Sequence, residues 1–127
     1  GDQNLGLLGQ RSDGQTFKSA QALADAIAKT LGRTPTVVSE EARPLQKIAW
    51  CSGGAQSYFE DAIAAGADAF ITGEISEPQA HLARETGVAF LACGHHATER
   101  YGAPAVATHV AQMLGLTHQF IDFDNPA

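Results

Sequence analysis

From Lys47 onward, short apolar segments alternate regularly with segments of helical periodicity. The apolar segments predict strands at 48–51, 69–72, 88–92 and 118–123, and the segments between them predict helices at 56–65, 77–85 and 104–114. Such alternation forms βαβ units, whose right-handed crossovers make a sheet at least partly parallel. Short, continuously apolar strands are typical of a sheet covered on both faces. The sequence therefore predicts a three-layer α/β domain with a mostly parallel or mixed sheet.

The N-terminal part adds one more helix and one more strand. Five apolar residues recur at the spacing of a single buried helix face, and they predict a helix over 19–31 that ends at Gly32. These residues are Ala20, Leu23, Ala24, Ile27 and Leu31. The segment 36–38 is β-branched and predicts a short strand.

Charge and hydropathy exclude several classes of partner. The net charge is −6, with only 8 Lys and Arg among 127 residues, and no basic run offers the positive charge that nucleic acid binding needs. No apolar run approaches the roughly 18 residues that would span a bilayer. Cys51 and Cys93 are too few for a disulfide framework and are expected to be buried thiols. We expect a cytoplasmic protein that binds neither nucleic acid nor a membrane.

Three strand-to-helix connections concentrate the chemically active side chains. They span 52–57, 72–77 and 94–100, and they carry histidines, carboxylates and hydroxyls. Ligands of an open α/β sheet bind at the carboxyl ends of its strands, where these connections lie. Imidazole and carboxylate groups are ligands of divalent metals.

The connection 94–100 carries the clearest candidate ligands. His95 and Glu99 are four residues apart, so on a helical turn their Cβ atoms lie about 5–6 Å apart on one face. They can then hold one divalent ion or two neighbouring ions. His96 points elsewhere, and Pro104 predicts a separate turn over 96–101 before the next helix. The alternative is that His95 caps the sheet and Glu99 pairs with a neighbour, because two ligands do not complete a site.

The other two connections leave more alternatives open. Glu74, at a strand end, can orient a metal-bound histidine, act as a general base, or supply charge to the next helix N-terminus. The turn 52–54 can present N–H groups to a phosphate, or it can be an ordinary tight turn. His81 faces either the cleft or solvent.

Four blocks in this sequence carry a family resemblance. They run from Ile48 to Ser57, from Gly66 to Glu74, from Gly94 to Arg100 and from Phe120 to Pro126. In this order they resemble the C-terminal half of the GTP cyclohydrolase 1 type 2 homologues, a Nif-three-like family, and are closest to its bacterial YbgI type. The resemblance runs from about residue 5 to the end of the chain.

The resemblance implies a two-lobed fold in a toroidal homohexamer, with two divalent metal ions per full-length subunit in a cleft between the lobes. It implies that His95 and Glu99 are the C-terminal metal ligands. The family's other ligands, a His-His pair and an Asp, belong to an N-terminal half that has no counterpart here. We therefore expect a fragment that holds metal weakly or not at all. Residues 1–16 would be the bridge from the missing lobe, and residues 17–127 the C-terminal metal-site lobe.

The function that the resemblance implies is metal-dependent hydrolysis of a small molecule, with Glu74 as the catalytic proton shuttle. GTP ring opening is implied by the family name alone, and the isolated chain is expected to be inactive. Zn, Fe, Mn and Ni all suit a set of His and carboxylate ligands. One alternative is a non-catalytic, metal-responsive binding or scaffold ring. Another is a nucleotide-binding domain that uses the turn 52–54, whose glycine pattern is incomplete.

Overall fold

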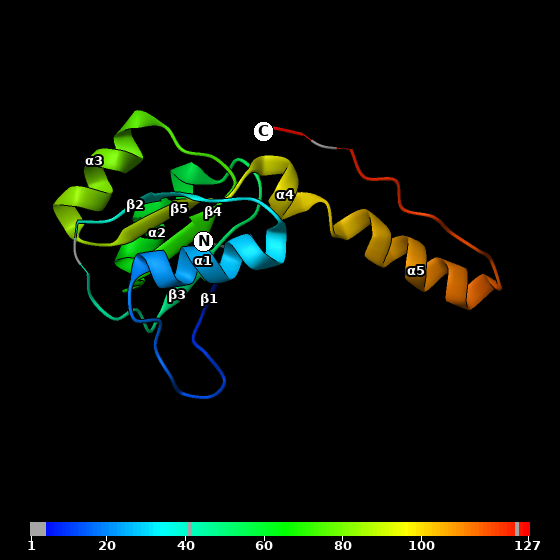
Figure 1. Cartoon of the computed structure of the whole chain (residues 1–127), viewed down its shortest axis with the longest axis horizontal. Helices are drawn as coiled ribbons and strands as arrows, with labels where there is room; N and C mark the ends of the chain where they lie inside the picture. The colour runs from blue at the N-terminus through cyan, green and yellow to red at the C-terminus, as the bar shows by residue number, and fades with distance from the viewer. Residues whose placement is uncertain (1–4, 41, 124) are drawn as a thin grey trace.

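The computed structural model describes residues 5–40, 42–123 and 125–127 of the chain. Figure 1 shows a sheet flanked by helices, with one further helix extending away from this body. The strands are β1 (Leu7–Gly9), β2 (Thr36–Val38), β3 (Ile48–Trp50), β4 (Ala69–Thr72) and β5 (Ala89–Ala92). The helices are α1 (Ala20–Leu31), α2 (Phe59–Ala64), α3 (Glu77–Thr86), α4 (His95–Glu99) and α5 (Gly102–Leu114), and the 3₁₀ turn η1 (Gln56–Tyr58) precedes α2.

The sheet is mixed, as predicted, with strand order β1-β3-β4-β5-β2. The three central strands β3, β4 and β5 are parallel to one another, and the outer strands β1 and β2 pair antiparallel to β3 and β5. Parallel pairing brings the carboxyl ends of β3, β4 and β5 to the same edge. The three chemically active connections therefore begin side by side.

Alternate residues of the central strands pack on opposite sides of the sheet, which produces two apolar cores. On one side Ile48, Ala69 and Leu91 pack with α1. On the other side Phe70 and Phe90 pack with α2 and α3. Helices thus cover both faces, and the predicted three-layer α/β architecture is confirmed.

An aromatic cluster forms the centre of the second core. The Phe59 ring meets the Phe90 ring edge to face at 4.9 Å between centroids, and it stacks with Phe70 at 5.8 Å. All three rings are almost completely buried, and burial of each stabilises the fold by roughly 1.5–3 kcal/mol.

The helix ends follow the sequence signals closely. Ser19 caps α1 by accepting a hydrogen bond from the Ala22 N–H at 3.1 Å, and Gly32 ends α1 in the left-handed region at φ +70°. A turn, α4, precedes α5 as Pro104 predicted, and the helix predicted over 56–65 is divided into η1 and α2.

In the part of the chain that the structure describes, no helix is long and apolar enough to cross a membrane.

The strand predicted over 118–123 is not formed, and that prediction is wrong for this chain. These residues join none of the five strands and instead run back along α5 (Figure 1). His118 Nε2 lies 3.2 Å from Thr108 Oγ1 of α5. A strand requires a neighbouring strand for its backbone hydrogen bonds, and none lies beside this segment.

The approach to β3 is fixed by Asp68. Its carboxylate accepts hydrogen bonds from Arg43 Nη1 at 2.7 Å and from the backbone N–H groups of Gln46 and Lys47 at 2.8 and 2.9 Å. Partial burial, the largest single influence, raises the pKa of Asp68, but the hydrogen bonds from Arg43, Lys47 and Gln46 together outweigh it and lower that pKa. Asp68 thereby holds the segment that leads into the central sheet.

Replacing Asp68 by Ala is expected to lower the free energy of unfolding by about 2–3 kcal/mol, because two amides and a guanidinium lose their acceptor. The folded-state pKa of Asp68 is depressed, so its contribution is present above the unfolded pKa and is lost as pH falls through the folded value. Urea unfolding of wild type and Asp68→Ala at neutral and acidic pH measures both effects. The exposed Glu85→Ala on α3 is the control, expected within about 0.5 kcal/mol of wild type. An equal loss in both variants would contradict this role of Asp68.

Candidate metal centre

The three connections pack directly against one another at the carboxyl edge of the sheet. The Gly73 N–H donates to the Gly53 carbonyl at 2.8 Å, and the Gly94 N–H donates to the Gly73 carbonyl at 2.9 Å. The Thr72 hydroxyl also donates to the Gly53 carbonyl, at 3.0 Å. A Cβ at Gly73 would lie 2.6 Å from that carbonyl oxygen and 2.7 Å from His95 Cα, so only glycine permits this approach.

His95 lies between two carboxylates from different connections. Its Nδ1 is 2.5 Å from Glu74 Oε1, and its Nε2 is 3.0 Å from Glu99 Oε2. His95 opens α4 and Glu99 ends it, so the predicted shared helical face is formed. Glu74 reaches His95 from the connection after β4, and the Gln56 Nε2 donates to the other oxygen of Glu74 at 3.3 Å. The three predicted site residues are therefore in contact.

The two carboxylates stabilise the charged form of the imidazole. The pKa of His95 is raised, chiefly by its hydrogen bond with Glu74, with Glu99 adding to the effect and burial opposing it. The pKa of Glu74 is lowered, chiefly by its hydrogen bond with His95. A proton on His95 Nε2 takes up the position between the imidazole and Glu99, where a divalent cation would contact both groups.

Gly53 shapes the space beside Glu99. Its φ is +70°, and a Cβ at this position would overlap Glu99 Oε1 and lie 3.2 Å from His95 Nε2. The Gly53 N–H donates to Thr98 Oγ1 at 2.9 Å, and the Ala55 N–H donates to Thr72 Oγ1 at 3.3 Å. One amide of the turn 52–54 and the amide that follows the turn are thus already paired within the protein. The turn 52–54 therefore makes room for the Glu99 carboxylate, and the phosphate-cradle alternative loses support.

These residues fit one side of a metal centre. His95 Nε2 and Glu99 provide two converging donors, while Glu74 is engaged by His95 Nδ1 and orients the ring. Within the described ranges, no group of three or more His, Cys, Asp or Glu side chains is arranged to hold a metal ion. Since even zinc takes three or four ligands, a complete site needs donors from beyond these residues.

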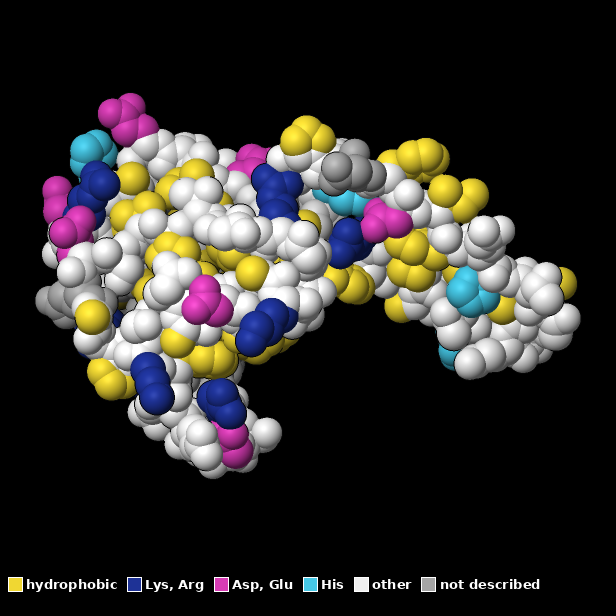
Figure 2. All heavy atoms as spheres, in the orientation of Figure 1, with side chains coloured by type: hydrophobic (Ala, Val, Ile, Leu, Met, Phe, Trp, Pro, Cys, Tyr) yellow, Lys and Arg dark blue, Asp and Glu magenta, His cyan; other side chains and the backbone are white. Residues whose placement is uncertain are grey.

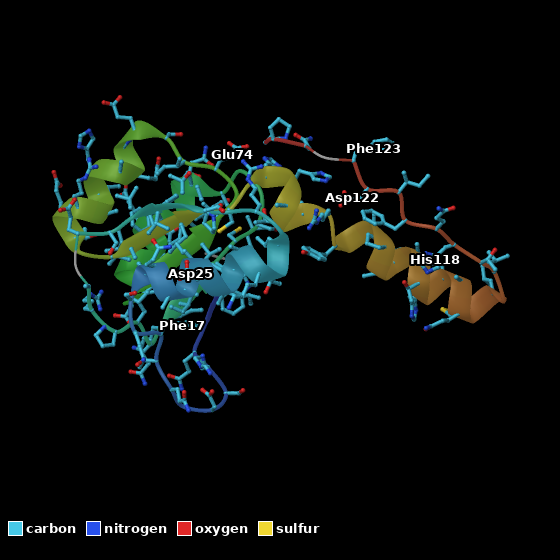
Figure 3. The ribbon with its side chains drawn as sticks, viewed as in Figure 1. Phe17, Asp25, Glu74, His118, Asp122 and Phe123 are labelled. Atoms are coloured by element: carbon cyan, nitrogen blue, oxygen red, sulfur yellow. The ribbon has the colours of Figure 1, made fainter. Side chains whose placement is uncertain are left out.

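His96 and His81 lie outside this cluster. His96 points away, as predicted, with its Nε2 3.0 Å from Asp122 Oδ1, and Arg100 Nη1 donates to the other Asp122 oxygen at 2.9 Å. Figure 3 shows Asp122 on the C-terminal segment, apart from Glu74. His81 lies on the exposed side of α3, 3.8 Å from Glu77 Oε1, so the solvent-facing alternative is the one observed.

The two cysteines differ in their surroundings. Cys93 is fully buried, as predicted, and burial raises the pKa of its thiol to about 12. Cys51 is only half-buried, short of the burial expected for it, and its Sγ donates to the Leu5 carbonyl at 3.3 Å. Burial, followed by the nearby charge of Glu99, raises the pKa of Cys51. Neither thiol is poised as a nucleophile.

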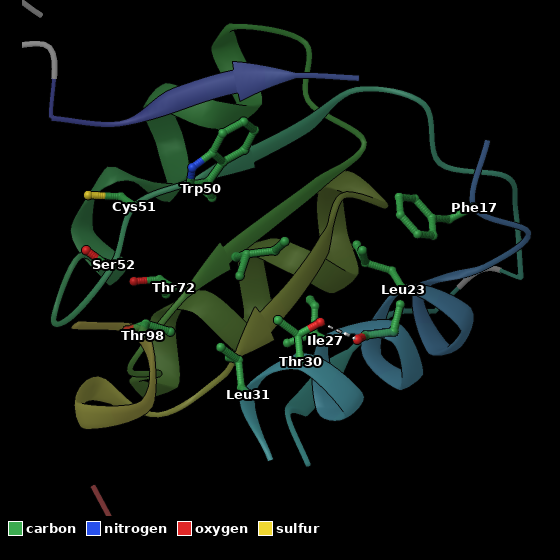
Figure 4. A pocket seen from close by; sticks show the side chains of 12 residues that line it. Phe17, Leu23, Ile27, Thr30, Leu31, Trp50, Cys51, Ser52, Thr72 and Thr98 are labelled. Atoms are coloured by element: carbon green, nitrogen blue, oxygen red, sulfur yellow. Dashed lines mark hydrogen bonds between the residues drawn. The ribbon is translucent and has the colours of Figure 1, made fainter. Parts of the chain in front are cut away.

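A cavity of about 360 Å³ adjoins the site and was not predicted. Figure 4 shows the hydroxyls of Ser52, Thr72 and Thr98 at one end of it, with Phe17 and Leu23 at the other. Its wall is otherwise mostly apolar. Trp50, 41% exposed at the end of β3, lines part of this cavity, whose closure by α1 depends on tertiary packing and left no signal in the sequence.

Comparison with known proteins identifies the family. The profile of the Duf34/NIF3 (NGG1p interacting factor 3) family matches residues 2–126. The chain belongs to this family. A protein of Neisseria meningitidis named "GTP cyclohydrolase 1 type 2 homolog" is 48% identical over the whole chain, which covers 50% of that protein. A Pseudomonas aeruginosa protein of the same name is 50% identical over 80% of this chain and 40% of its own length. This Duf34/NIF3 chain thus spans about half the length of the curated relatives it matches.

Solved structures agree with this assignment. The structure described as "protein ybgI, unknown function" matches with a TM-score of 0.87 at 41% identity, over 97% of this chain and 49% of that one. A Thermus thermophilus protein matches with a TM-score of 0.76 at 27% identity, over 86% and 43% of the two chains. The resemblance to the Duf34/NIF3 family and its fold is confirmed, over about half of the length of these relatives.

A pair of glycine variants tests the shape of the site. Gly53→Ala and Gly66→Ala both place a Cβ at positive φ, +70° and +75°, so each is expected to cost about 1–2 kcal/mol of stability. Only Gly53→Ala pushes that Cβ into Glu99, because Gly66 has open space around it. Gly53→Ala should therefore shift the NMR signals of the His95 imidazole, and Gly66→Ala should leave them in place. Identical His95 spectra in the two variants would refute the steric argument.

Glu74→Gln is expected to lower the pKa of His95, because the hydrogen bond with Glu74 is the largest cause of its elevation. An NMR pH titration of the imidazole measures this. Since the pKa of His95 is raised in the folded chain, the pair stabilises the fold below the unfolded pKa, and this contribution is lost as pH rises through the folded value. Glu77→Gln, which changes the partner of His81, is the control. An unchanged His95 pKa in Glu74→Gln would exclude Glu74 as the cause.

Proposed function

We propose that this chain supplies one side of a two-metal hydrolytic centre, with His95 and Glu99 as its metal ligands. The observation that carries the proposal is the convergence of His95 Nε2 and Glu99 Oε2, 3.0 Å apart, at the carboxyl edge of the parallel strands. Gly53 supports it, since the lack of a side chain there leaves room for the Glu99 carboxylate.

The remaining ligands belong, in this proposal, to an N-terminal lobe. The chain covers about half of relatives named "GTP cyclohydrolase 1 type 2 homolog", and the two donors found among its described residues do not complete a centre. We further propose two divalent ions, of Zn, Fe, Mn or Ni, in each two-lobed subunit of a cytoplasmic homohexamer. The isolated chain is then a weak metal binder without activity.

Within such a centre Glu74 is a positioning residue. By accepting a hydrogen bond from His95 Nδ1 it directs Nε2 toward Glu99, and Gln56 holds the Glu74 carboxylate from its other side. Two bound ions would supply an activated water and polarise the bond to be cleaved. The role of Glu74 as a proton shuttle remains a prediction, and it requires the carboxylate to leave His95 during the reaction.

The neighbouring cavity supports the proposal that the substrate is a small molecule. It opens beside the proposed centre at Ser52 and Thr98, and its volume of about 360 Å³ is in the range of small-molecule pockets. Its apolar wall favours a substrate with a hydrophobic or ring portion, while the Ser52 hydroxyl at one end can bind a polar group.

The test is a two-lobed chimera in which this chain follows the N-terminal half of the Neisseria meningitidis relative. Elemental analysis should find about two metal ions per chain, as two-metal chemistry requires. His95→Ala and Glu99→Gln should each weaken metal binding more than Glu74→Gln, for which a loss of about 10–100-fold is expected of a residue that orients a ligand. His81→Ala, on the exposed side of α3, should bind metal like wild type.

Equal metal content in Glu99→Gln and wild type would rule out the ligand assignment. Hydrolysis is then tested separately, by assaying the metal-loaded chimera with nucleotides, peptides and phosphoesters as substrates. A chimera that binds metal but cleaves none of them would favour the non-catalytic scaffold alternative and end the hydrolase proposal.

A further inference from the structure

The Thr98 hydroxyl joins α4 to the turn that follows β3. Thr98 lies between His95 and Glu99 on α4. Its Oγ1 shares its proton between the carbonyl oxygens of Gly94 and His95, at 2.9 and 3.0 Å. The same oxygen accepts a hydrogen bond from the Gly53 N–H at 2.9 Å. One half-buried hydroxyl thus connects two segments that are 45 residues apart in the sequence.

A bond from a helical threonine back to the preceding turn is common, and other threonines of this chain make it. Thr30, Thr86 and Thr108 donate to the carbonyl four residues earlier, at 3.2, 2.6 and 2.7 Å. Thr108 does so on α5, which extends away from the body of the molecule (Figures 1 and 2). Among the described residues, Thr98 alone of these four also accepts from a backbone amide of another strand-to-helix connection. Helix geometry therefore explains its donated bond but not its accepted one.

Gly53 is held through both of its backbone polar groups. Its carbonyl accepts hydrogen bonds from the Gly73 N–H at 2.8 Å and from the Thr72 hydroxyl at 3.0 Å. Its N–H donates to Thr98, its one acceptor within the described residues, and Figure 4 shows Thr72 and Thr98 near this turn. Removing the Thr72 hydroxyl would leave the Gly53 carbonyl bonded to Gly73, whereas removing the Thr98 hydroxyl would leave a buried amide without its acceptor. The N–H side of the turn thus depends on Thr98.

The position of this turn bears directly on both candidate ligands. A Cβ on Gly53 would overlap Glu99 Oε1 and lie 3.2 Å from His95 Nε2, so Gly53 lines the space in which the two groups converge. The Glu99 side chain is 51% exposed and needs such a wall to limit its orientations. Since Thr98 directly precedes Glu99, its bond to the Gly53 N–H sets how closely the wall and the carboxylate approach. A ligand that is ordered before the ion arrives loses less conformational entropy on binding it.

We propose that Thr98 is a positioning residue of the metal centre. Its hydroxyl holds the Gly53 turn against α4 and thereby restricts Glu99 to the orientation in which it meets a cation beside His95 Nε2. This role rests on the proposed function of His95 and Glu99 as metal ligands. Thr98 acts through Glu99, because its own hydroxyl is already engaged as donor and as acceptor.

The test measures the affinity of the two-lobed chimera for Zn²⁺ in three variants. Thr98→Val keeps the shape of the side chain without its hydroxyl, and it should weaken Zn²⁺ binding by about 10-fold or more, as expected of a residue that orients a ligand. Thr98→Ser retains the hydroxyl and should restore the affinity. Thr72→Val removes the other hydroxyl at Gly53 but leaves the bond from Gly73, so it should bind Zn²⁺ nearly as tightly as wild type.

Urea unfolding separates positioning from stability. Thr98→Val and Thr72→Val should both lower the resistance to urea, because each leaves one backbone amide without its acceptor, that of Gly53 or that of Ala55. Only Thr98→Val should also lose affinity for Zn²⁺. Wild-type affinity in Thr98→Val, an equal loss in Thr72→Val, or no recovery in Thr98→Ser would each overturn the proposal.

Two further measurements need no metal. In the chain alone at a fixed pH, the NMR signal of the Glu99 carboxyl carbon should shift in Thr98→Val and stay in place in Thr98→Ser and Thr72→Val. The Gly53 amide of wild type should exchange slowly with solvent, which requires no substitution. An unmoved Glu99 signal in Thr98→Val or rapid exchange of the Gly53 amide would overturn the proposal. A wild-type chimera that binds no Zn²⁺ would refute the metal centre instead, and the Glu99 signal would then show whether Thr98 still orders that carboxylate.

Discussion

The architecture of the site depends on the contact among Gly53, Gly73 and Gly94, where the three parallel strands end. Hydrogen bonds of 2.8 and 2.9 Å link these glycines in series, and a Cβ at Gly73 would meet both neighbouring connections within 2.7 Å. This approach brings Glu74 from one connection against His95 of the next. It also leaves beside Gly53 the space that Glu99 enters. The side chains of the candidate centre are thus positioned by backbone packing.

The same packing creates an electrostatic conflict that a cation resolves. Glu74 and Glu99 approach His95 from its two ring nitrogens, and two carboxylates near a neutral ring would repel each other. A proton on the imidazole gives both carboxylates a positive partner, and the hydrogen bond between His95 and Glu74 is the chief reason that the pKa of His95 is raised and that of Glu74 is lowered. A divalent ion between Nε2 and Glu99 would relieve the repulsion as well, while Glu74 kept its hydrogen bond to Nδ1. The arrangement therefore suits both a protonated and a metal-bound form.

Local patterns in the sequence predicted most of the fold and part of the site. Periodicity located α1, α3 and the strands β2 to β5 apart from their exact ends, and the spacing of His95 and Glu99 predicted their shared face. The contact of Glu74 with His95, and the support from Gln56, join segments 21 and 18 residues apart and depend on the register between strands. The strand predicted at 118–123 failed for a related reason. Residue preferences favour a strand there, but these residues run along α5 and pair with none of the five strands, although the outer strands β1 and β2 each have only one partner.

The segment that leads into α5 is firmly held, whereas most of that helix is exposed. Arg100 donates to the Leu31 carbonyl at the end of α1 at 2.7 Å and to Asp122 at 2.9 Å, and Asp122 also contacts His96. These bonds tie α1, α4 and residues 118–123 together immediately after Glu99. The positions of His95 and Glu99 therefore depend on this hydrogen-bond network as well as on the packing of the three glycine connections.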